Sequence, residues 1–150
     1  MTHSRYSSHD YLFRAALINF VSAFFHIVVP FNGVTDYIYI GTNKFALLEM
    51  QRSPLPEPAN LLLALVFAVF GMYCLSGAEM MRPLPWLNPT LWFIGGLYTL
   101  RGSVLVFGLL GLINEPLPPI HLIVSMLALV IGVMILIGMR KKNLERAAIK

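Results

Sequence analysis

Four long apolar segments constrain the fold of this chain more than any other feature. They run over Leu12 to Val29, Leu61 to Ala78, Leu91 to Ile113 and Ile120 to Met139. A helix needs about 20 mostly apolar residues to cross a bilayer, within a range of about 17 to 25. We therefore predict an all-α membrane protein, a four-helix transmembrane bundle that forms one domain over residues 1–150.

The composition agrees with a membrane location. Hydrophobic residues make up 57% of the 150 residues and charged residues only 12%, whereas a soluble domain carries about 25% charged residues. A chain this short has too little interior to bury so much apolar surface. The lipid bilayer is therefore the first expected partner. The net charge of +4 does not indicate nucleic acid, because the basic residues gather near the chain ends, where membrane topology accounts for them.

Prolines mark the expected ends of the predicted helices. Pro30 is expected to stop the first helix. Asn88 and Pro89 resemble the cap and first turn of the third, because proline needs no donor partner there. The segment from Glu115 to Pro119 is a short, stiff turn. Such a connection predicts that the third and fourth helices are antiparallel neighbours.

The distribution of Lys and Arg predicts the orientation. With four spans both termini lie on one side, and that side holds eight basic residues: Arg5, Arg14, Arg82, Arg140, Lys141, Lys142, Arg146 and Lys150. The other side holds only Lys44 and Arg52. Because short cytoplasmic flanks are enriched in Lys and Arg, we expect both termini in the cytoplasm and residues 140–150 to form a basic cytoplasmic tail.

The connection from Phe31 to Asn60 is the only long one. Its segment Phe45 to Met50 is expected to form a short amphipathic helix, too short to span, that lies across the bundle mouth or in the interface. Long loops in compact domains are often lids or binding elements, and a structured cap over the bundle is the alternative.

Small residues recur at helix-packing intervals within the apolar segments. Such residues let membrane helices approach closely. They are Ala64, Ala68 and Gly71 in the second helix, Gly95, Thr99, Gly102 and Ser103 in the third, and Ser125, Ala128 and Gly132 in the fourth. Cys74, the only cysteine, is expected to be a packed core thiol.

Arg101 lies near the middle of the third apolar segment. A charge at that depth costs about 2.5 to 3.5 kcal/mol on insertion scales, so it must find a partner, reach water or serve a function. One interpretation is a structural residue that pairs with Asn19 and backbone carbonyls. The other is a binding site, since arginine suits two-point recognition of carboxylate or phosphate.

Other polar residues are predicted to gather around Arg101. Asn19, Ser22 and His26 share one face of the first helix. At about 1.5 Å per residue, depths from the inner edge are about 12 Å for Asn19, 16 Å for Arg101, 22 Å for His26 and 27 Å for His121. Asp36, Glu49 or Glu115 would supply a negative charge from the outer loops. The predicted ligand-binding pocket, open to the outer side, therefore comprises Arg101, Asn19, His26, His121 and Glu49.

Each of these residues also has a purely structural interpretation. His26 would be a hydrogen-bonded interior histidine and His121 an interfacial one. His3 and His9 are expected in a disordered tail, and Glu79 is expected to form an exposed ion pair with Arg82.

The sequence does not favour a metal or haem site. Haem held by His26 and His121 is disfavoured because their depths differ by about one helical turn. The chain has no HExxH motif and no cluster of Cys and His residues, so no metal site is expected. The sequence does not identify a cofactor.

Three segments together resemble a known group. Tyr73 to Ala78, Arg82 to Pro85 and Tyr98 to Gly102 are similar to segments of small, uncharacterised four-helix integral membrane proteins of bacteria, broadly DoxX-like. The resemblance implies a bacterial inner-membrane location and a recurring role for Arg101. The chain departs from the pattern at Glu79, where a small residue is expected.

Three functional hypotheses follow. The sequence favours a non-enzymatic protein that binds a lipophilic or anionic small molecule or serves as an accessory subunit of a membrane complex. The second hypothesis is an enzyme or redox protein acting on a quinone- or isoprenoid-like substrate, with His26 or Glu49 carrying protons. The third is an immunity-type protein that blocks a membrane-targeting toxin. A membrane-protein partner or a homodimer is compatible with the small-residue faces.

Overall fold

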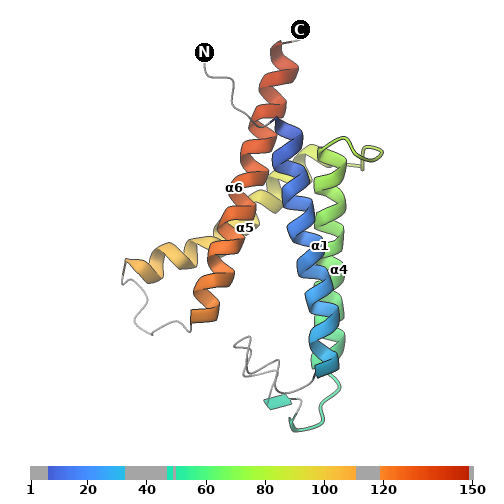
Figure 1. The fold of residues 1–150 in the computed structure, drawn as a ribbon, viewed down its shortest axis with the longest axis vertical. Helices are drawn as coiled ribbons and strands as arrows, with labels where there is room; N and C mark the ends of the chain where they lie inside the picture. Colours follow the sequence, from blue (N-terminus) through green and yellow to red (C-terminus); the bar gives the residue numbers. More distant parts are fainter. Residues whose placement is uncertain (1–6, 33–46, 49, 111–118, 149–150) are drawn as a thin grey trace.

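Four α-helices form the architecture (Figure 1). The computed structural model describes residues 7–32, 47–48, 50–110 and 119–148. The helices are α1 (Ser8–Asn32), α4 (Pro56–Gly77), α5 (Leu87–Leu109) and α6 (Pro119–Ala148), and no strand occurs in those ranges. Each helix is long and apolar enough to cross a membrane. The predicted all-α, four-helix membrane fold is confirmed, and the chain is a small multi-pass membrane protein.

Two features of α1 differ from the prediction. The helix starts at Ser8 because Ser7 and Asp10 form a cap: the Ser7 backbone N–H donates to Asp10 Oδ2 over 2.8 Å. Pro30 does not stop the helix, which continues to Asn32. A proline this close to the end removes only one backbone donor, so the last turn tolerates it.

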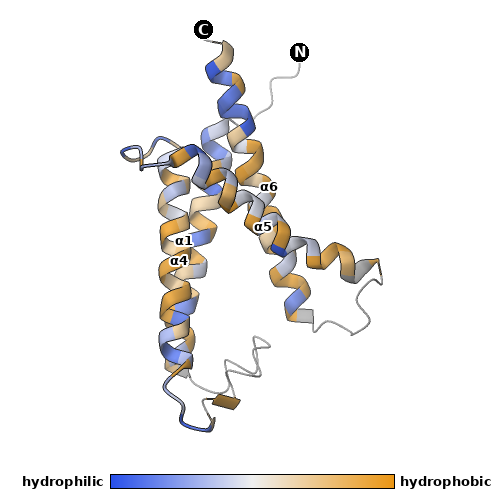
Figure 2. Cartoon of the chain, turned by 180° about the vertical axis from the view of Figure 1, so that it is seen from behind, coloured by the Kyte–Doolittle hydropathy of each residue, from blue (hydrophilic) through white to orange (hydrophobic). Residues whose placement is uncertain are grey.

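The helix α6 continues well beyond the apolar segment. It ends at Ala148 rather than near Met139, so residues 140–148 of the predicted basic tail are helical and project past the other helices. Figure 2 shows this projecting end as the most hydrophilic part of the helix.

The connections are described only in part. Half of the predicted helix over Phe45 to Met50 lies outside the described residues, while Leu47, Leu48 and Met50 are helical. The Gln51 N–H donates to Leu47 O over 3.1 Å, which makes a single helical turn. The helix α5 ends at Leu109.

The helices pack as two antiparallel pairs, α1 with α4 and α5 with α6, which are joined mainly through α1 and α6. At the point that we call the α5–α6 crossing, formed by Thr99, Gly102, Leu129 and Gly132, the two backbones almost touch. A Cβ atom on Gly102 would lie 2.6 Å from the Leu129 backbone, and one on Gly132 would lie 2.6 Å from Thr99 Oγ1. The predicted close packing of small residues is confirmed for these two helices.

The hydrophobic core lies in one half of the bundle. We name the two ends of the bundle the termini end (Ser8, Gly77, Leu87 and Ala148) and the loop end (Asn32, Pro56, Leu109 and Pro119). The core lies between the termini end and the α5–α6 crossing, and it includes the predicted buried thiol of Cys74. Toward the loop end, α5 and the first turns of α6 diverge from α1 and α4 (Figure 1). The core residues are Leu12, Ala15, Ala16, Cys74, Ala78, Leu91, Ile94, Tyr98, Ala128, Ile131, Ile135 and Met139.

Candidate functional site

Arg101 is held beside the α5–α6 crossing. It lies about 21 Å along α5 from Leu87, at about 1.5 Å per residue, which places it well inside the apolar span. Its Nη1 donates to Ser125 Oγ over 3.0 Å. Ser125 is fully buried, whereas the Arg101 side chain is exposed at the protein surface. The ion pairs among the described residues do not involve Arg101.

Asn19 has a different partner from the predicted one. It is fully buried, and its Nδ2 donates to Ala15 O over 2.8 Å. Its Oδ1 accepts a hydrogen bond of 2.5 Å from the Tyr98 hydroxyl. Tyr98 lies one helical turn before Arg101 on α5, so this bond ties α1 to α5 next to the arginine. Tyr98 was not among the predicted site residues, because by sequence alone a tyrosine in an apolar segment is indistinguishable from a packed aromatic residue.

His26 faces its own helix and an aromatic wall. Its Nδ1 lies 2.8 Å from Ser22 O, and since a carbonyl only accepts, Nδ1 carries the hydrogen. The ring packs on Phe67 at a centroid distance of 4.9 Å, and Phe67 stacks on Tyr98 at 6.5 Å. His26 is thus connected to the Asn19–Tyr98 pair through aromatic rings.

The remaining predicted residues lie apart or outside the described chain. His121 is half-buried on the third residue of α6, close to the loop end. Glu49 lies outside the described residues, as do Asp36 and Glu115.

The predicted residues therefore form two linked groups rather than one ring of side chains. Asn19 and Tyr98 are buried and are linked to the half-buried rings of His26 and Phe67, whereas the exposed Arg101 pairs with the buried Ser125. In the described ranges, no group of three or more His, Cys, Asp or Glu side chains is placed to hold a metal ion. The chemistry available at Arg101 is that of a fixed cation with spare N–H donors.

A second polar group, which sequence reasoning missed, lies at the termini end. Lys142 Nζ donates to Gly77 O over 2.6 Å and lies 3.1 Å from Glu79 Oε1. His9 Nδ1 donates to Ala78 O over 2.9 Å, and its Nε2 lies 3.8 Å from Glu79 Oε2. We call His9, Glu79 and Lys142 the termini-end cluster. Two predictions were wrong: His9 lies in α1 rather than in a disordered tail, and Glu79 pairs with Lys142 rather than with Arg82.

The end of α4 explains how Glu79 is placed in this cluster. Glu79 follows the last turn of α4 with a positive φ of 58°. The Glu79 N–H donates to Ser76 O and the Met80 N–H donates to Leu75 O, both over 3.1 Å, which is the pattern of a Schellman motif. Glycine is the usual residue at this left-handed position. The glutamate there is therefore the one local feature of the sequence that pointed to an unusual role for Glu79.

Burial distinguishes the two charges of the cluster. The side chain of Lys142 is only 6% exposed and that of Glu79 is 58% exposed. The hydrogen bond from Lys142, and then the charge of Lys142, lower the pKa of Glu79 below its ordinary value. The buried ammonium thus has two acceptors, Gly77 O and the Glu79 carboxylate, while the carboxylate still faces solvent.

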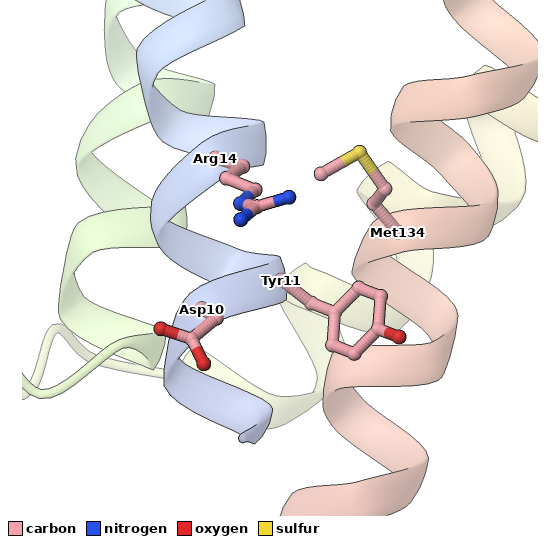
Figure 3. Close-up of a pocket in the computed structure, with 4 residues that line it drawn as sticks. All are labelled: Asp10, Tyr11, Arg14 and Met134. Atoms are coloured by element: carbon pink, nitrogen blue, oxygen red, sulfur yellow. The ribbon is translucent and has the colours of Figure 1, made fainter. Parts of the chain in front are cut away.

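Two hollows lie near this end of the bundle. The smaller, about 160 Å³, lies between α1 and α6 and is lined by Asp10, Tyr11, Arg14 and Met134 (Figure 3). The larger, about 380 Å³, lies between the end of α4, the start of α5 and the projecting part of α6. It is lined by Ser76, Glu79, Met81, Pro83, Leu87, Lys142 and Arg146.

No protein family model, curated protein or solved structure matches this chain.

Proposed function

We propose that this chain is a non-enzymatic protein of the bacterial inner membrane, akin to the DoxX-like group, that binds an anionic lipophilic small molecule through Arg101. One observation carries the proposal. The exposed guanidinium of Arg101 lies deep within a membrane-spanning helix, and its one hydrogen bond among the described residues goes to the Ser125 hydroxyl.

The energetics of charge in lipid support this proposal. A cation at membrane depth is costly unless it is compensated, and a single neutral hydroxyl compensates it only in part. An arginine has five N–H donors in a planar fork. With one of them on Ser125, the remaining donors suit a carboxylate or phosphate, which would supply the missing negative charge.

The surrounding residues would act on this site indirectly. The bond between Tyr98 and Asn19 fixes the position of α5 one turn before Arg101. The bond to Ser125 orients the guanidinium from α6. Asn19 and His26 already have hydrogen-bond partners, so we assign them a positioning role.

The orientation belongs to the same proposal. We infer that the termini end faces the cytoplasm, because the projecting part of α6 carries Arg140, Lys141, Lys142 and Arg146. Reporter domains fused after Lys150 should be active only if they function in the cytoplasm. Activity of a periplasmic reporter at that position would overturn the orientation.

The binding test uses two probes of the same chain length, one with a charged and one with a neutral head group. Oleate should bind the purified protein, and oleyl alcohol, with the same chain length and no charge, should bind much more weakly. The variant Arg101→Gln should lose the preference for oleate while its thermal unfolding midpoint stays close to that of the wild type. The variant Arg101→Lys should retain part of it, because lysine keeps the charge without the planar fork.

Two results would reject the proposal. Equal loss of folded protein in Arg101→Gln and Arg101→Lys would make Arg101 a structural residue. A protein that co-purifies from the native membrane in stoichiometric amount, with no small molecule bound, would instead favour an accessory-subunit role.

A further inference from the structure

The larger hollow at the termini end has the features of a separate binding site. Its lining combines two cations, Lys142 and Arg146, with one carboxylate, Glu79, and an apolar wall of Met81, Pro83 and Leu87. Its volume of about 380 Å³ falls within the range of about 300 to 1,000 Å³ that is typical of ligand pockets.

The basic side of this hollow is built by α6. Lys142 and Arg146 are four residues apart, so they lie on the same face of the helix. Lys142 is fixed by Gly77 O and Glu79, which use two of its three N–H donors. Arg146 is exposed, and the ion pairs of the described chain do not include it.

The opposite wall is fixed by Ser76. Its hydroxyl donates to Arg82 O over 3.1 Å and accepts from the Leu84 N–H over 2.9 Å. These two bonds hold the turn between α4 and α5 in place, and with it Pro83, which forms part of the apolar wall. Both walls of the hollow are therefore held by hydrogen bonds.

The hollow lies at the level of the lipid head groups. It lies where two membrane-spanning segments meet the interface, since α4 ends at Gly77 and α5 begins at Leu87. Lipid phosphates occupy this level. Basic pockets between transmembrane helices on the cytoplasmic side bind lipid head groups.

The charges indicate which head group would fit. Two cations and one carboxylate leave one net positive charge in the hollow, and a single phosphodiester would neutralise it. We propose that this hollow binds the phosphate of one anionic phospholipid from the adjacent leaflet, with the phosphate on Arg146 and the spare N–H of Lys142 and the glycerol against Met81, Pro83 and Leu87.

The test measures lipid binding by native mass spectrometry of the detergent-solubilised protein. The probe is palmitoyl-oleoyl phosphatidylglycerol, and palmitoyl-oleoyl phosphatidylcholine is the comparison lipid with no net charge. We expect one phosphatidylglycerol per chain at low lipid concentration. The variant Arg146→Gln should weaken this binding about fivefold, the effect of one basic residue near an anionic lipid.

Arg140→Gln is the matched control. Arg140 is an exposed basic residue of α6 that does not line the hollow. The Arg140→Gln variant should bind phosphatidylglycerol as the wild type does. Equal weakening by Arg140→Gln and Arg146→Gln would show diffuse attraction to a basic surface and would overturn the proposal.

Two further measurements separate this site from other sources of binding. Phosphatidylcholine should bind the wild type more weakly and should not respond to Arg146→Gln. Displacement of phosphatidylglycerol by an equal concentration of inorganic phosphate would overturn the lipid assignment in favour of a free-anion site. Arg101→Gln should keep its phosphatidylglycerol, because this proposal does not depend on the one made for Arg101.

Discussion

At the termini end all four helices contribute to one core, whereas toward the loop end only α1 and α4 remain paired and α5 leans away with the start of α6 (Figure 1). The two ends also treat their cations differently. Lys142 is buried and uses two of its three donors on Gly77 O and Glu79. Arg101 is exposed, and its described hydrogen bonding is limited to Ser125.

The difference between the two cations assigns them different roles: Lys142 stabilises the fold and Arg101 is available for binding. A buried cation whose donors are mostly satisfied within the protein holds helices together, and its removal is expected to affect folding. An exposed cation with spare donors in an apolar span contributes little to the core but remains available to a ligand. The α5–α6 crossing is the boundary between the packed termini end and the open loop end, because α5 and α6 are closest there and diverge beyond it.

The largest expected effect is therefore at the crossing itself. A Cβ atom on Gly102 would lie 2.6 Å from the backbone of Leu129, which cannot move aside as a side chain can. Gly102→Ala should lower the free energy of unfolding by about 3 kcal/mol, the upper part of the range for overpacking. An unfolding titration with sodium dodecyl sulfate in mild detergent measures this value.

Gly96→Ala is the control on the same helix, since a Cβ atom there meets nothing within 4 Å. It should leave the stability unchanged or raise it slightly, because alanine favours the helix. If both variants were equally stable, the crossing would not be a closely packed boundary and the comparison between the two ends would fail.

The second expected effect tests the buried cation. Lys142→Met removes the donor to Gly77 O and the ion-pair partner of Glu79. Hydrogen bonds to charged groups contribute about 1.5 to 3 kcal/mol, and the solvent exposure of Glu79 places the expected loss near the lower limit, at about 1.5 kcal/mol. Arg140→Met, which removes an exposed charge from the same helix, should change the stability by less than about 0.5 kcal/mol. Similar losses in the two variants would mean that Lys142 acts only through net charge.

The sequence predicted the parts of the fold that bilayer thickness dictates. The four helices follow from the lengths of the apolar segments, and the contacts at Gly102 and Gly132 follow from small residues at helical intervals. Helix ends were less predictable. The Ser7–Asp10 cap and the extension of α6 to Ala148 involve polar residues, which an apolar pattern does not register.

The partners of the polar residues could not be predicted for a different reason. Depth counted along a helix assumes that the helices are parallel, but α5 leans away from α1 toward the loop end, so similar depths do not bring Asn19 and Arg101 into contact (Figure 1). The termini-end cluster combines residues from α1, from the end of α4 and from α6. Such a combination depends on how the start of α1 and the end of α4 pack against α6, and no local sequence pattern encodes it.

A smaller effect is expected where the two helix pairs are joined. Tyr98→Phe removes the donor to the buried Oδ1 of Asn19. Hydrogen bonds between membrane helices contribute on average about 0.6 kcal/mol and at most about 1.7, so we expect a loss of about 1 kcal/mol in the same titration. Tyr73→Phe is the control, because its hydroxyl makes an exposed bond of 3.2 Å to Pro85 O, and it should cost nearly nothing. A larger loss of stability in Tyr73→Phe than in Tyr98→Phe would mean that the stronger hydrogen bond lies outside the core.

The smallest expected effect is a dependence of stability on pH that arises from Glu79 at the termini end. Lys142 lowers the pKa of Glu79 in the folded protein. As the pH falls, the unfolded state therefore binds a proton at Glu79 before the folded state does. The stabilisation is fully present above the ordinary glutamate pKa of about 4.3 and is lost as the pH falls through the lower pKa of Glu79 in the folded protein. The effect is small because more than half of the Glu79 side chain is exposed to solvent.

Unfolding titrations between neutral and acidic pH should show this loss in the wild type, and Glu79→Gln and Lys142→Met should each reduce it. A loss of the same size in all three proteins would assign the pH dependence to other carboxylates and would remove Glu79 from the contacts that stabilise this end.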